Sequence, residues 1–372
     1  MKTRVLSATD TPCSAEAFSE AASALRAGSL VVFPTETVYG VGASAARAEA
    51  VELLGRLKER PDDKPFTLHL PDPELAARYA GPLPLVARRL IRKAWPGPVM
   101  LVVPDQRASR DATLGLVETS VYWHGTVGLR CPDHDVGRAV LREAGVPVVA
   151  TSANLPGRPP PRSAEEALRE LGGRVSVVVD AGPTAFARPS TVVRVRSDGR
   201  LEVLREGAVA AHRVRRMAVT RVLVVCSGNM CRSPMAEGLA KKMAAERLGC
   251  EVVELGEHGL EIASAGTGAG MGGPASRHAV EAMRELGVDL RYHRTRGLTV
   301  DLVRGSDYIW VMTRGHKRSV SELAPEAAER VALLGAAGEE IGDPIGGDLE
   351  AYRACAERIE RAVAEWIPEI VE

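Results

Sequence analysis

The strongest constraint on the fold of this chain is an apolar run that leads into a polar loop and then a helical segment. The run is RVLVVCS, residues 221–227, and its composition is typical of a buried strand. The segment SPMAEGLAKKMAAERLG, 233–249, has helical spacing. Strands and helices keep alternating, with short loops, up to a closing helix that begins near Asp348. This alternation predicts a parallel, doubly wound sheet.

The first half of the chain also reads as α/β. An amphipathic segment, SAEAFSEAASALRAGSL, ends at Gly28 before the apolar LVVFPT. Further expected strands are TLHL, VMLVVP, TVGLR, VPVVAT, VSVVVD, TVVRV and LEVLR, with helices such as ARRLIRKAW and SAEEALRELG between them. A chain of 372 residues is long for one core, so two domains are expected. The basic stretch 208–219 carries no turn signal and is predicted to be the junction, with domains at 1–213 and 214–372.

Charge and cysteine usage narrow the setting. The 48 Lys and Arg balance the 48 Asp and Glu, so the chain as a whole does not attract nucleic acid or anionic membranes. Binding to RNA would require a local basic patch. Six scattered cysteines do not suggest a disulfide framework. With no signal-peptide pattern and no apolar run long enough to span a bilayer, a cytoplasmic protein is expected.

The loop VCSGNMCRSP, 225–234, holds the first candidate site. Cys226 and Cys231 lack further Cys or His partners at zinc-ligand spacing, and two buried thiols would not explain Gly228, Asn229 or Arg232. A loop between a parallel strand and a helix lies where anions bind, because its N–H groups and the helix dipole are both electropositive. Gly228 would permit the tight turn, and Arg232 would hold two phosphate oxygens.

This cradle predicts nucleophilic catalysis on a phosphate. Cys226 at its base would be favoured as a thiolate by the N–H groups and Arg232. It would then attack phosphorus in line. In the late segment GDPIGGDLEAYR, Asp343 stands on a turn and is a candidate general acid for the leaving group.

The Cys-x(5)-Arg-Ser-Pro loop and the late Asp-Pro resemble the low-molecular-weight protein-tyrosine-phosphatase family over residues 220–370. The resemblance implies a phosphocysteine at Cys226, transition-state stabilisation by Arg232, and Asp343 as acid and then base. It implies that Cys231 protects Cys226 through a reversible disulfide. The other implied members of the phosphate loop and its support are Ser227, Gly228, Asn229, Met230, Ser233, Ser264 and His293.

Two departures leave the phosphatase substrate open between phosphotyrosine and phosphoarginine. Ile345, Gly346 and Gly347 follow Asp-Pro where tyrosine-specific members carry aromatic residues, which resembles the arginine-phosphatase branch. Met230, however, stands where that branch has threonine. An arsenate reductase is a minor alternative, since it needs a downstream cysteine pair and only the widely separated Cys250 and Cys355 are present.

The first half carries three polar motifs in order. They are PTETVYG at 34–40, the pair Lys58 and Arg60, and the pair Ser152 and Asn154 at the end of an apolar strand. Each alone is typical of a polar turn or a solvated face. Together they resemble the YrdC/TsaC family of threonylcarbamoyl-AMP synthases over residues 14–210.

That resemblance implies a twisted α/β sheet with a positively lined cavity. The activity it implies joins L-threonine, bicarbonate and ATP into threonylcarbamoyl-adenylate, with Mg²⁺ bound to the phosphates, for the modification of tRNA by downstream enzymes. The implied threonine site is Thr35, His69, Arg130 and Ser190. The implied ATP site is Lys58, Arg60, Ser152, Asn154 and Arg205.

Three departures keep alternatives open for this half. Thr151 replaces a common proline, Pro160 stands where a polar ATP contact is common, and Pro189 replaces a glutamate. A YciO-like paralogue or an RNA-binding module is therefore an alternative, as is one inactive half. We expect a bifunctional enzyme, the second half acting on a phosphoprotein.

Overall fold

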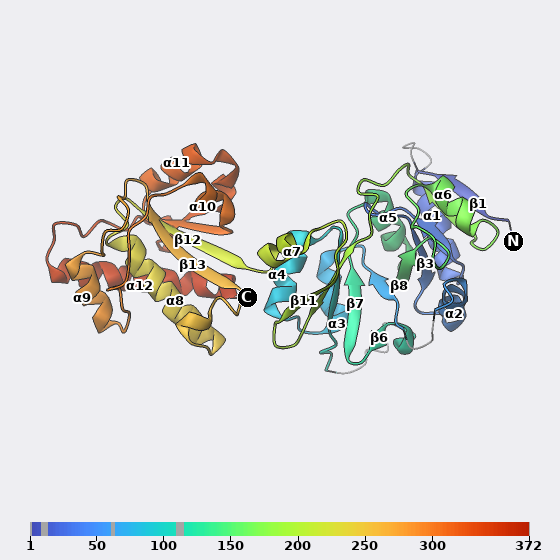
Figure 1. The fold of residues 1–372 in the computed structure, drawn as a ribbon, viewed down its shortest axis with the longest axis horizontal. Helices are drawn as coiled ribbons and strands as arrows, with labels where there is room; N and C mark the ends of the chain where they lie inside the picture. The colour runs from blue at the N-terminus through green and yellow to red at the C-terminus, as the bar shows by residue number, and fades with distance from the viewer. Residues whose placement is uncertain (1, 9–13, 61–63, 109–114, 372) are drawn as a thin grey trace. The chain divides into compact units, whose positions relative to one another are not determined.

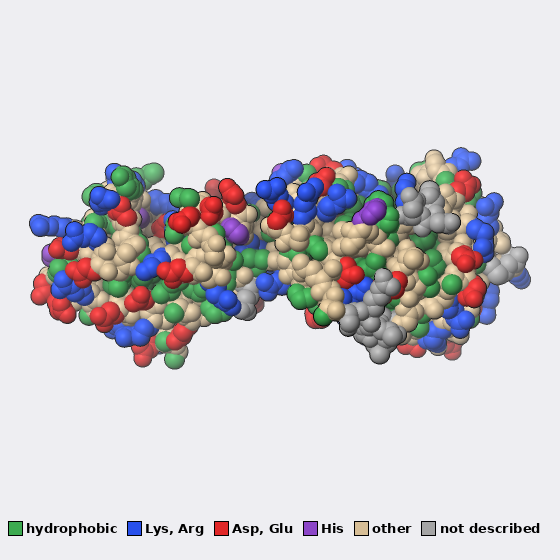
Figure 2. Space-filling view, turned by 90° about the horizontal axis from the view of Figure 1, so that it is seen from below, with side chains coloured by type: hydrophobic (Ala, Val, Ile, Leu, Met, Phe, Trp, Pro, Cys, Tyr) green, Lys and Arg blue, Asp and Glu red, His purple; other side chains and the backbone are tan. Residues whose placement is uncertain are grey.

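The computed structural model describes residues 2–8, 14–60, 64–108 and 115–371. It divides into two compact units, of which the first ends at Ala218 and the second begins at Val219. Among the described residues, none of the helices combines the length and apolar character needed to cross a bilayer. On the face shown in Figure 2, basic and acidic side chains are interspersed.

The N-terminal unit is built on one mixed sheet, which in the described residues has eleven strands in the order β1-β9-β2-β3-β8-β4-β7-β5-β10-β11, with β6 paired to β7 (Figure 1). The strands are β1 (Arg4–Ser7), β2 (Val31–Phe33), β3 (Gly40–Ser44), β4 (Thr67–His69), β5 (Val99–Pro104), β6 (Tyr122–Trp123), β7 (Thr126–Arg130), β8 (Val148–Ser152), β9 (Val177–Asp180), β10 (Thr191–Val195) and β11 (Leu201–Arg205). The expected strands of this half are confirmed, and β1, β3 and β6 are additions.

Helices cover both faces of this sheet because successive strand residues point to opposite sides. Val31 and Phe33 pack with α1 (Ser14–Arg26) and α5 (Asp135–Ala144), whereas Val32 belongs to the larger core on the other face. The helices of the larger core are α2 (Ala48–Leu57), α3 (Ala76–Ala80), α4 (Leu85–Ala94), α6 (Ala164–Leu171) and α7 (Ala211–Met217).

The predicted junction is a helix in the structure. In α7, Val214 is fully buried, and both it and Ala218 belong to the larger N-terminal core. The first unit therefore extends five residues beyond the predicted boundary at 213, since the apolar side of this basic stretch packs onto the same domain.

The C-terminal unit confirms the predicted parallel sheet, whose four strands run in the order β13-β12-β14-β15. Its strands are β12 (Thr220–Cys226), β13 (Leu260–Gly266), β14 (Tyr308–Val311) and β15 (Val331–Leu333). Its α-helices are α8 (Arg232–Leu248), α9 (Arg277–Glu285), α10 (Val300–Gly305), α11 (Arg314–Leu323) and α12 (Leu349–Val371). Separate cores on the two sheet faces, one with α8, α9 and α12 and one with α10 and α11, make it doubly wound.

Candidate functional site

The cysteine loop leaves the carboxyl end of an interior strand. Cys226 is the last residue of β12, and α8 begins at Arg232. Because β12 lies between β13 and β14, the loop opens where the sheet order reverses, which is where ligands bind in sheets of this kind. The N-terminal end of α8 adds unpaired N–H groups and a positive dipole end. The local fold therefore suits an anion, as the sequence predicts.

The tight turn in this loop is made by Asn229 rather than by Gly228. Asn229 has a φ of 53°, in the left-handed region that asparagine tolerates better than most residues. Its Nδ2 donates to Ser233 Oγ at 2.9 Å and to Ser264 Oγ at 2.8 Å. The expectation for Gly228 was wrong because a buried amide with fixed partners can hold this backbone conformation.

A glycine is nevertheless required beside the loop, at the end of β13. A Cβ on Gly266 would lie 2.5 Å from the carbonyl oxygen of Ser227 and 2.9 Å from the amide nitrogen of Asn229. Real Cβ atoms do not approach so closely, so a larger residue at this position would push the loop away from the sheet.

The predicted support residues meet around Cys226. The Cys226 Sγ lies 3.0 Å from Ser233 Oγ, and His293 Nε2 lies 2.8 Å from the carbonyl oxygen of Asn229. Ser264 donates to the Glu237 carboxylate at 2.6 Å. Cys226 is buried, with 2% of its surface exposed. The structure thus brings Ser233, Ser264, Asn229 and His293 together with the candidate nucleophile.

Arg232 and Asp343 form an ion pair at the mouth of the loop. The guanidinium also donates from Nη1 to the Ile341 carbonyl at 3.1 Å and from Nη2 to Ser227 Oγ at 3.4 Å. Its Nε is buried and has no hydrogen-bond partner among the described residues. A buried donor without a partner is costly, and an anion in the loop would supply the acceptor.

Cys231 lies at the N-cap of α8 and is a free thiol, as is Cys226. Its Sγ lies 3.4 Å from Ser276 Oγ and 3.3 Å from the Tyr352 hydroxyl. Met230 is 39% exposed and Ile345, two residues after Asp343, is 66% exposed. These two side chains are therefore available at the surface near the candidate catalytic groups.

The sequence reasoning missed several partners of the loop. Glu237 lies one helical turn after Ser233, and this spacing places the two side chains on the same face of the helix, which could have indicated Glu237 as a partner. Arg296 donates from its backbone N–H to Asn229 Oδ1 at 3.0 Å and from Nε to the Ser264 carbonyl at 2.6 Å. Ser276, Tyr352 and His316 come from distant segments, and nothing in the local sequence connects them with the loop.

A second candidate site lies in a cavity of about 450 Å³ in the N-terminal unit. Alternate residues of neighbouring strands face it, because they share one side of the sheet. Seven predicted residues line it: Thr35, Arg60, His69, Arg130, Ser152, Ser190 and Arg205. All three noted departures, Thr151, Pro160 and Pro189, also line this cavity.

Arg130 and His69 stand side by side on the parallel pair β4 and β7. Arg130 Nη2 donates to Glu36 Oε1 at 3.0 Å and to Thr37 Oγ1 at 2.6 Å, so the PTET segment fixes the guanidinium. Burial, followed by the charge of Arg130, lowers the pKa of His69 to about 3. The ring is thus neutral, and its Nδ1 lies 3.2 Å from the Thr67 carbonyl, an acceptor, so Nδ1 carries the proton.

Lys58 and Asn154 lie next to this cavity and contact each other. Lys58 Nζ donates to the carbonyl of Ser152 at 3.0 Å and to the carbonyl of Asn154. The Asn154 amide donates to the Leu155 and Arg158 carbonyls at 2.9 and 2.7 Å. Burial, and then the nearby Arg60 charge, lowers the pKa of Lys58 to about 8.

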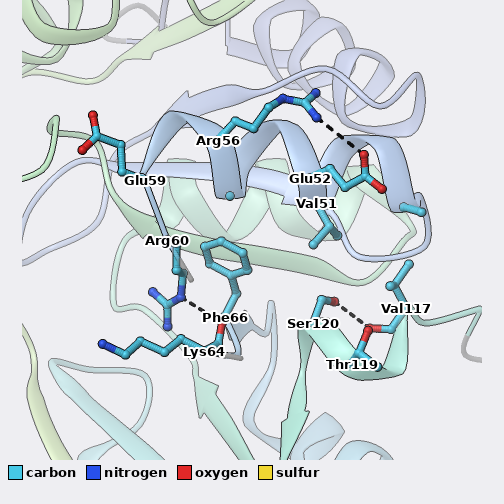
Figure 3. A pocket seen from close by; sticks show the side chains of 12 residues that line it. Val51, Glu52, Arg56, Glu59, Arg60, Lys64, Phe66, Val117, Thr119 and Ser120 are labelled. Carbon is cyan, nitrogen blue, oxygen red and sulfur yellow. Dashed lines mark hydrogen bonds and ion pairs between the residues drawn. The ribbon is translucent and has the colours of Figure 1, made fainter. Parts of the chain in front are cut away.

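Arg60 also lines a second cavity, of about 530 Å³, beside α2 (Figure 3). Its guanidinium lies over the Phe66 ring, 4.6 Å from the centroid, and Nε donates to the Lys64 carbonyl at 3.0 Å. Burial lowers the pKa of Arg60. Arg60 is thus held by contacts with its own loop, and it lines both cavities.

Thr35 and Ser190 already take part in hydrogen bonds within the protein, which the sequence does not show. The Thr35 hydroxyl donates to the Val38 carbonyl at 2.6 Å, so it closes its own turn. Arg205 Nη2 donates to the Ser190 carbonyl at 2.9 Å and lies 3.5 Å from its hydroxyl. Burial, and then Arg130, lowers the pKa of Arg205.

Comparison with known proteins separates the two units. The family model described as "Telomere recombination", the Sua5/YciO/YrdC model, matches residues 23–207. The model described as "Low molecular weight phosphotyrosine protein phosphatase" matches residues 221–372.

Relatives of the first unit are threonylcarbamoyl-AMP synthases. One from Bacillus subtilis is 38% identical over 198 residues, which cover 53% of this chain and 55% of that protein. One from Halorhodospira halophila is 35% identical over 178 residues, covering 48% of this chain and 89% of that protein. The crystal structure of Pyrococcus abyssi Sua5 complexed with L-threonine has a TM-score of 0.53 at 23% identity, covering 71% of this chain and 92% of that one.

The two groups of similar proteins match the two units separately, and each unit also has its own cores and its own candidate site. The chain spans 55% of the B. subtilis relative, so that protein has a further part which this match does not reach. Both families consist of enzymes. The chain belongs to the Sua5/YciO/YrdC family through its first unit, and its second unit matches the model of the low-molecular-weight phosphotyrosine protein phosphatases.

Proposed function

We propose that the N-terminal unit forms threonylcarbamoyl-adenylate from L-threonine, bicarbonate and ATP, with release of pyrophosphate. The observation that carries this proposal is the cavity in which three guanidinium groups, Arg60, Arg130 and Arg205, meet His69 and Ser152. Such a cavity suits reactants that carry carboxylate and phosphate groups.

The threonine end of the cavity is assigned to Arg130 and His69. Glu36 and Thr37 orient the Arg130 guanidinium, whose fork can pair with the threonine carboxylate. With Nδ1 of His69 protonated, its Nε2 is an acceptor for the substrate's ammonium or hydroxyl. Thr35 would contribute shape rather than a donor, since its hydroxyl proton is engaged.

The nucleotide end is assigned to Lys58, Arg60, Ser152, Asn154 and Arg205. Positive charge placed beside the triphosphate would stabilise the departing pyrophosphate, and positioning would bring the threonine carbamate near the α-phosphate. Pro160 offers no polar side chain, so one contact to ATP that is common in the family would be lost, and Pro189 lacks the carboxylate of the usual glutamate. A YciO-like activity is therefore the alternative for this unit.

Magnesium would enter with the nucleotide. Among the described residues no group of three His, Cys, Asp or Glu side chains is arranged to hold a metal ion. The oxygen donors of the cavity include the hydroxyls of Thr35, Ser152 and Ser190. Mg²⁺ held mainly by phosphate oxygens and water would offset part of the negative charge of the triphosphate.

Threonine-dependent release of pyrophosphate from ATP, in the presence of bicarbonate, tests this function. We expect Arg60→Ala to lower the rate at least about 100-fold, because a guanidinium that stabilises phosphate charge is removed. The Cys226→Ser variant is the control and should keep the full rate. A near-normal rate in Arg60→Ala would contradict the assigned nucleotide site.

The RNA-binding alternative makes a different forecast. Binding of tRNA that depends on phosphate contacts weakens steeply as salt rises. Tight, salt-sensitive binding of tRNA without any pyrophosphate release would favour the binding module. Our proposal links this unit to tRNA only indirectly, through enzymes that use the adenylate.

We further propose that the C-terminal unit hydrolyses a phosphoprotein through a phosphocysteine. The Cys226 thiolate would attack phosphorus while Asp343 gives its proton to the leaving oxygen or nitrogen. Water, deprotonated by the same carboxylate, would then displace the cysteine and release phosphate. Arg232 would exchange Asp343 for the equatorial phosphate oxygens, and its buried Nε, which has no hydrogen-bond partner among the described residues, supports that role.

The aliphatic rim of the loop favours phosphoarginine over phosphotyrosine. Ile345 follows the Asp-Pro pair and is exposed, so no aromatic wall stands there to flank a phenyl ring. Met230, also exposed, would oppose this preference by narrowing the approach to the loop. We expect Met230→Thr to raise the ratio of kcat/KM for phosphoarginine to that for phosphotyrosine. A ratio that stays flat would show that Met230 does not line the leaving-group pocket.

Two substitutions separate nucleophile from acid. Cys226→Ser should abolish turnover of every substrate. Asp343→Ala should cost little with p-nitrophenyl phosphate, whose leaving group departs unaided, but about 10²- to 10⁴-fold with phosphotyrosine. Equal losses on both substrates would contradict the role of Asp343 as the acid.

The arsenate-reductase alternative receives little support from the second downstream thiol. Cys355 lies on α12 with its Sγ 3.8 Å from the Gly342 carbonyl. Burial raises its pKa to about 11, so it is protonated and a poor resolving nucleophile at neutral pH.

The protective role of Cys231 and a cytoplasmic location stay predictions. Poorer recovery of Cys231→Ser than of the parent after mild peroxide and dithiothreitol would support the former.

A further inference from the structure

A buried histidine stands beside the phosphate loop without a place in the chemistry described so far. His316 lies in the first turn of α11, directly after β14, and is 7% exposed. Thr313 caps this helix, and its Oγ1 accepts from the His316 backbone N–H at 3.3 Å. The ring is therefore carried by a capped helix end at the same sheet edge as the loop.

Both ring nitrogens of His316 have hydroxyl partners. Nε2 lies 2.9 Å from Ser227 Oγ, and Nδ1 lies 2.9 Å from Thr313 Oγ1. Ser227 Oγ also accepts from Arg232 Nη2 at 3.4 Å. If His316 Nε2 carried a proton, its N–H would point at Ser227 Oγ, which already accepts a hydrogen bond from the positively charged Arg232. A Ser227 O–H that donates to Nε2 gives a polarised chain from Arg232 through Ser227 and His316 to Thr313.

We propose that His316 is a positioning residue of the phosphatase: by accepting from Ser227 at Nε2, it fixes the hydroxyl oxygen that orients the Arg232 guanidinium toward the phosphate. The inference rests on the proposed phosphatase function. The Ile341 carbonyl holds the other terminal nitrogen of Arg232, at 3.1 Å. Two fixed acceptors, one at each terminal nitrogen, would keep the plane of the fork constant while Asp343 is exchanged for phosphate.

The surroundings keep the ring in the required neutral state. Burial, and then the positive charge of Arg232, lowers the pKa of His316, while Asp343 and Glu340 act in the opposite direction more weakly. At neutral pH the Nε2 lone pair is thus available to Ser227. A protonated ring could not accept this bond.

Two substitutions of His316 test the proposal. One introduces a side chain without a hydrogen-bond acceptor, and the other introduces a side chain that has one. In His316→Phe, which keeps the bulk, we expect kcat/KM for p-nitrophenyl phosphate to fall about tenfold, the size of effect expected from one lost hydrogen bond. Inhibition by inorganic phosphate should weaken in parallel, since the same fork binds it. In His316→Gln, whose amide oxygen can reach the place of Nε2, we expect most of both losses to be restored. Rates are compared per folded protein, with melting temperatures recorded for each variant.

A double substitution shows whether His316 acts through Ser227. If it does, adding His316→Phe to Ser227→Ala should cost little beyond Ser227→Ala alone, because coupled residues are not additive. Additive losses, an unaffected His316→Phe enzyme, or a Gln variant as impaired as the Phe variant would each overturn the inference. An inactive parent enzyme, or full activity in Cys226→Ser, would instead overturn the proposed function.

Discussion

At the scale of the residue, Asn229 has two roles in the loop, one for its backbone and one for its side chain. Its backbone is left-handed, and its side chain donates to both Ser233 and Ser264. We expect Asn229→Ala to lower the phosphatase kcat/KM about 100-fold or more, because both the hydrogen bonds and the tolerance for this φ are lost.

Asn229→Gly is the matched control, since glycine adopts the same φ without strain but makes no side-chain bonds. Its activity should fall between that of the parent and that of the alanine variant. If glycine restored the full rate, the two hydrogen bonds would contribute nothing to the loop.

In the proposed synthase, Lys58 would give a pH dependence that an ordinary lysine would not. Its pKa of about 8 lies below the ordinary lysine value of 10.5 because the amine is partly buried beside Arg60. The charged form is thus lost as pH rises through about 8 rather than above 10. We expect kcat/KM for ATP to decline between pH 8 and 9.5, measured by pyrophosphate release.

Lys58→Arg separates this effect from other titrations, since a guanidinium stays charged over the whole range. Its profile should be flatter across the same interval, whatever its absolute level. The same decline in both proteins would assign the titration to another group.

At the scale of the element, α7 decides where the first domain ends. Val214 and Ala218 pack into the N-terminal core, although the surrounding sequence is basic. A fragment that ends at residue 213 should therefore unfold at lower urea concentration than one that ends at 218. The loss should be about 1.5–3 kcal/mol, the value of a buried valine.

Within the 1–218 fragment, Val214→Ala should reproduce much of this loss, whereas the exposed Arg213→Ala should change stability little. Equal stability of the two fragments would show that α7 does not belong to the first domain's core.

Elements with a clear apolar period could be predicted from the sequence, and those that depend on close packing could not. The apolar runs at 99–104, 148–152 and 222–226 all form strands. Strand β3, GVGAS, was missed because glycine disfavours strands. Gly42 is needed there because a Cβ would lie 2.8 Å from the Phe33 ring.

The sites divide in the same way. Cys226, Arg232 and Asp343 could be named from local motifs, and so could the cavity residues Arg60 and Arg130. Glu36 lies within the PTETVYG motif, but only the folded sheet shows that it pairs with Arg130. Tyr352 and His316 reach the loop from far along the chain, and local patterns carry no information on such contacts.

At the scale of the whole molecule, each unit has its own cores. Apolar clusters of residues within 6–218 and within 222–371 are separate, and each unit carries a complete candidate site. We expect two activities that can be removed one at a time. Lys58→Ala should abolish adenylate formation and leave hydrolysis of p-nitrophenyl phosphate within about twofold.

Cys226→Ser should do the converse in the same preparation. Addition of threonine and ATP should leave the phosphatase rate of the parent unchanged if the sites are independent. A reproducible change in that rate, absent from the Lys58→Ala protein, would show coupling between them.

The ion pair between Arg232 and Asp343 has a consequence best expressed as competition. Asp343 is a carboxylate ligand tethered next to the anion site, so its effective concentration there is high and cannot be diluted. On the proposed mechanism, a substrate phosphate would bind only by displacing it, and each apparent affinity would be reduced by the fraction of time that the tether is engaged. The displaced carboxyl group is then free to take up a proton. A tethered competitor of this kind would make the proposed acid available only when a phosphate, and hence a leaving group, already occupies the loop.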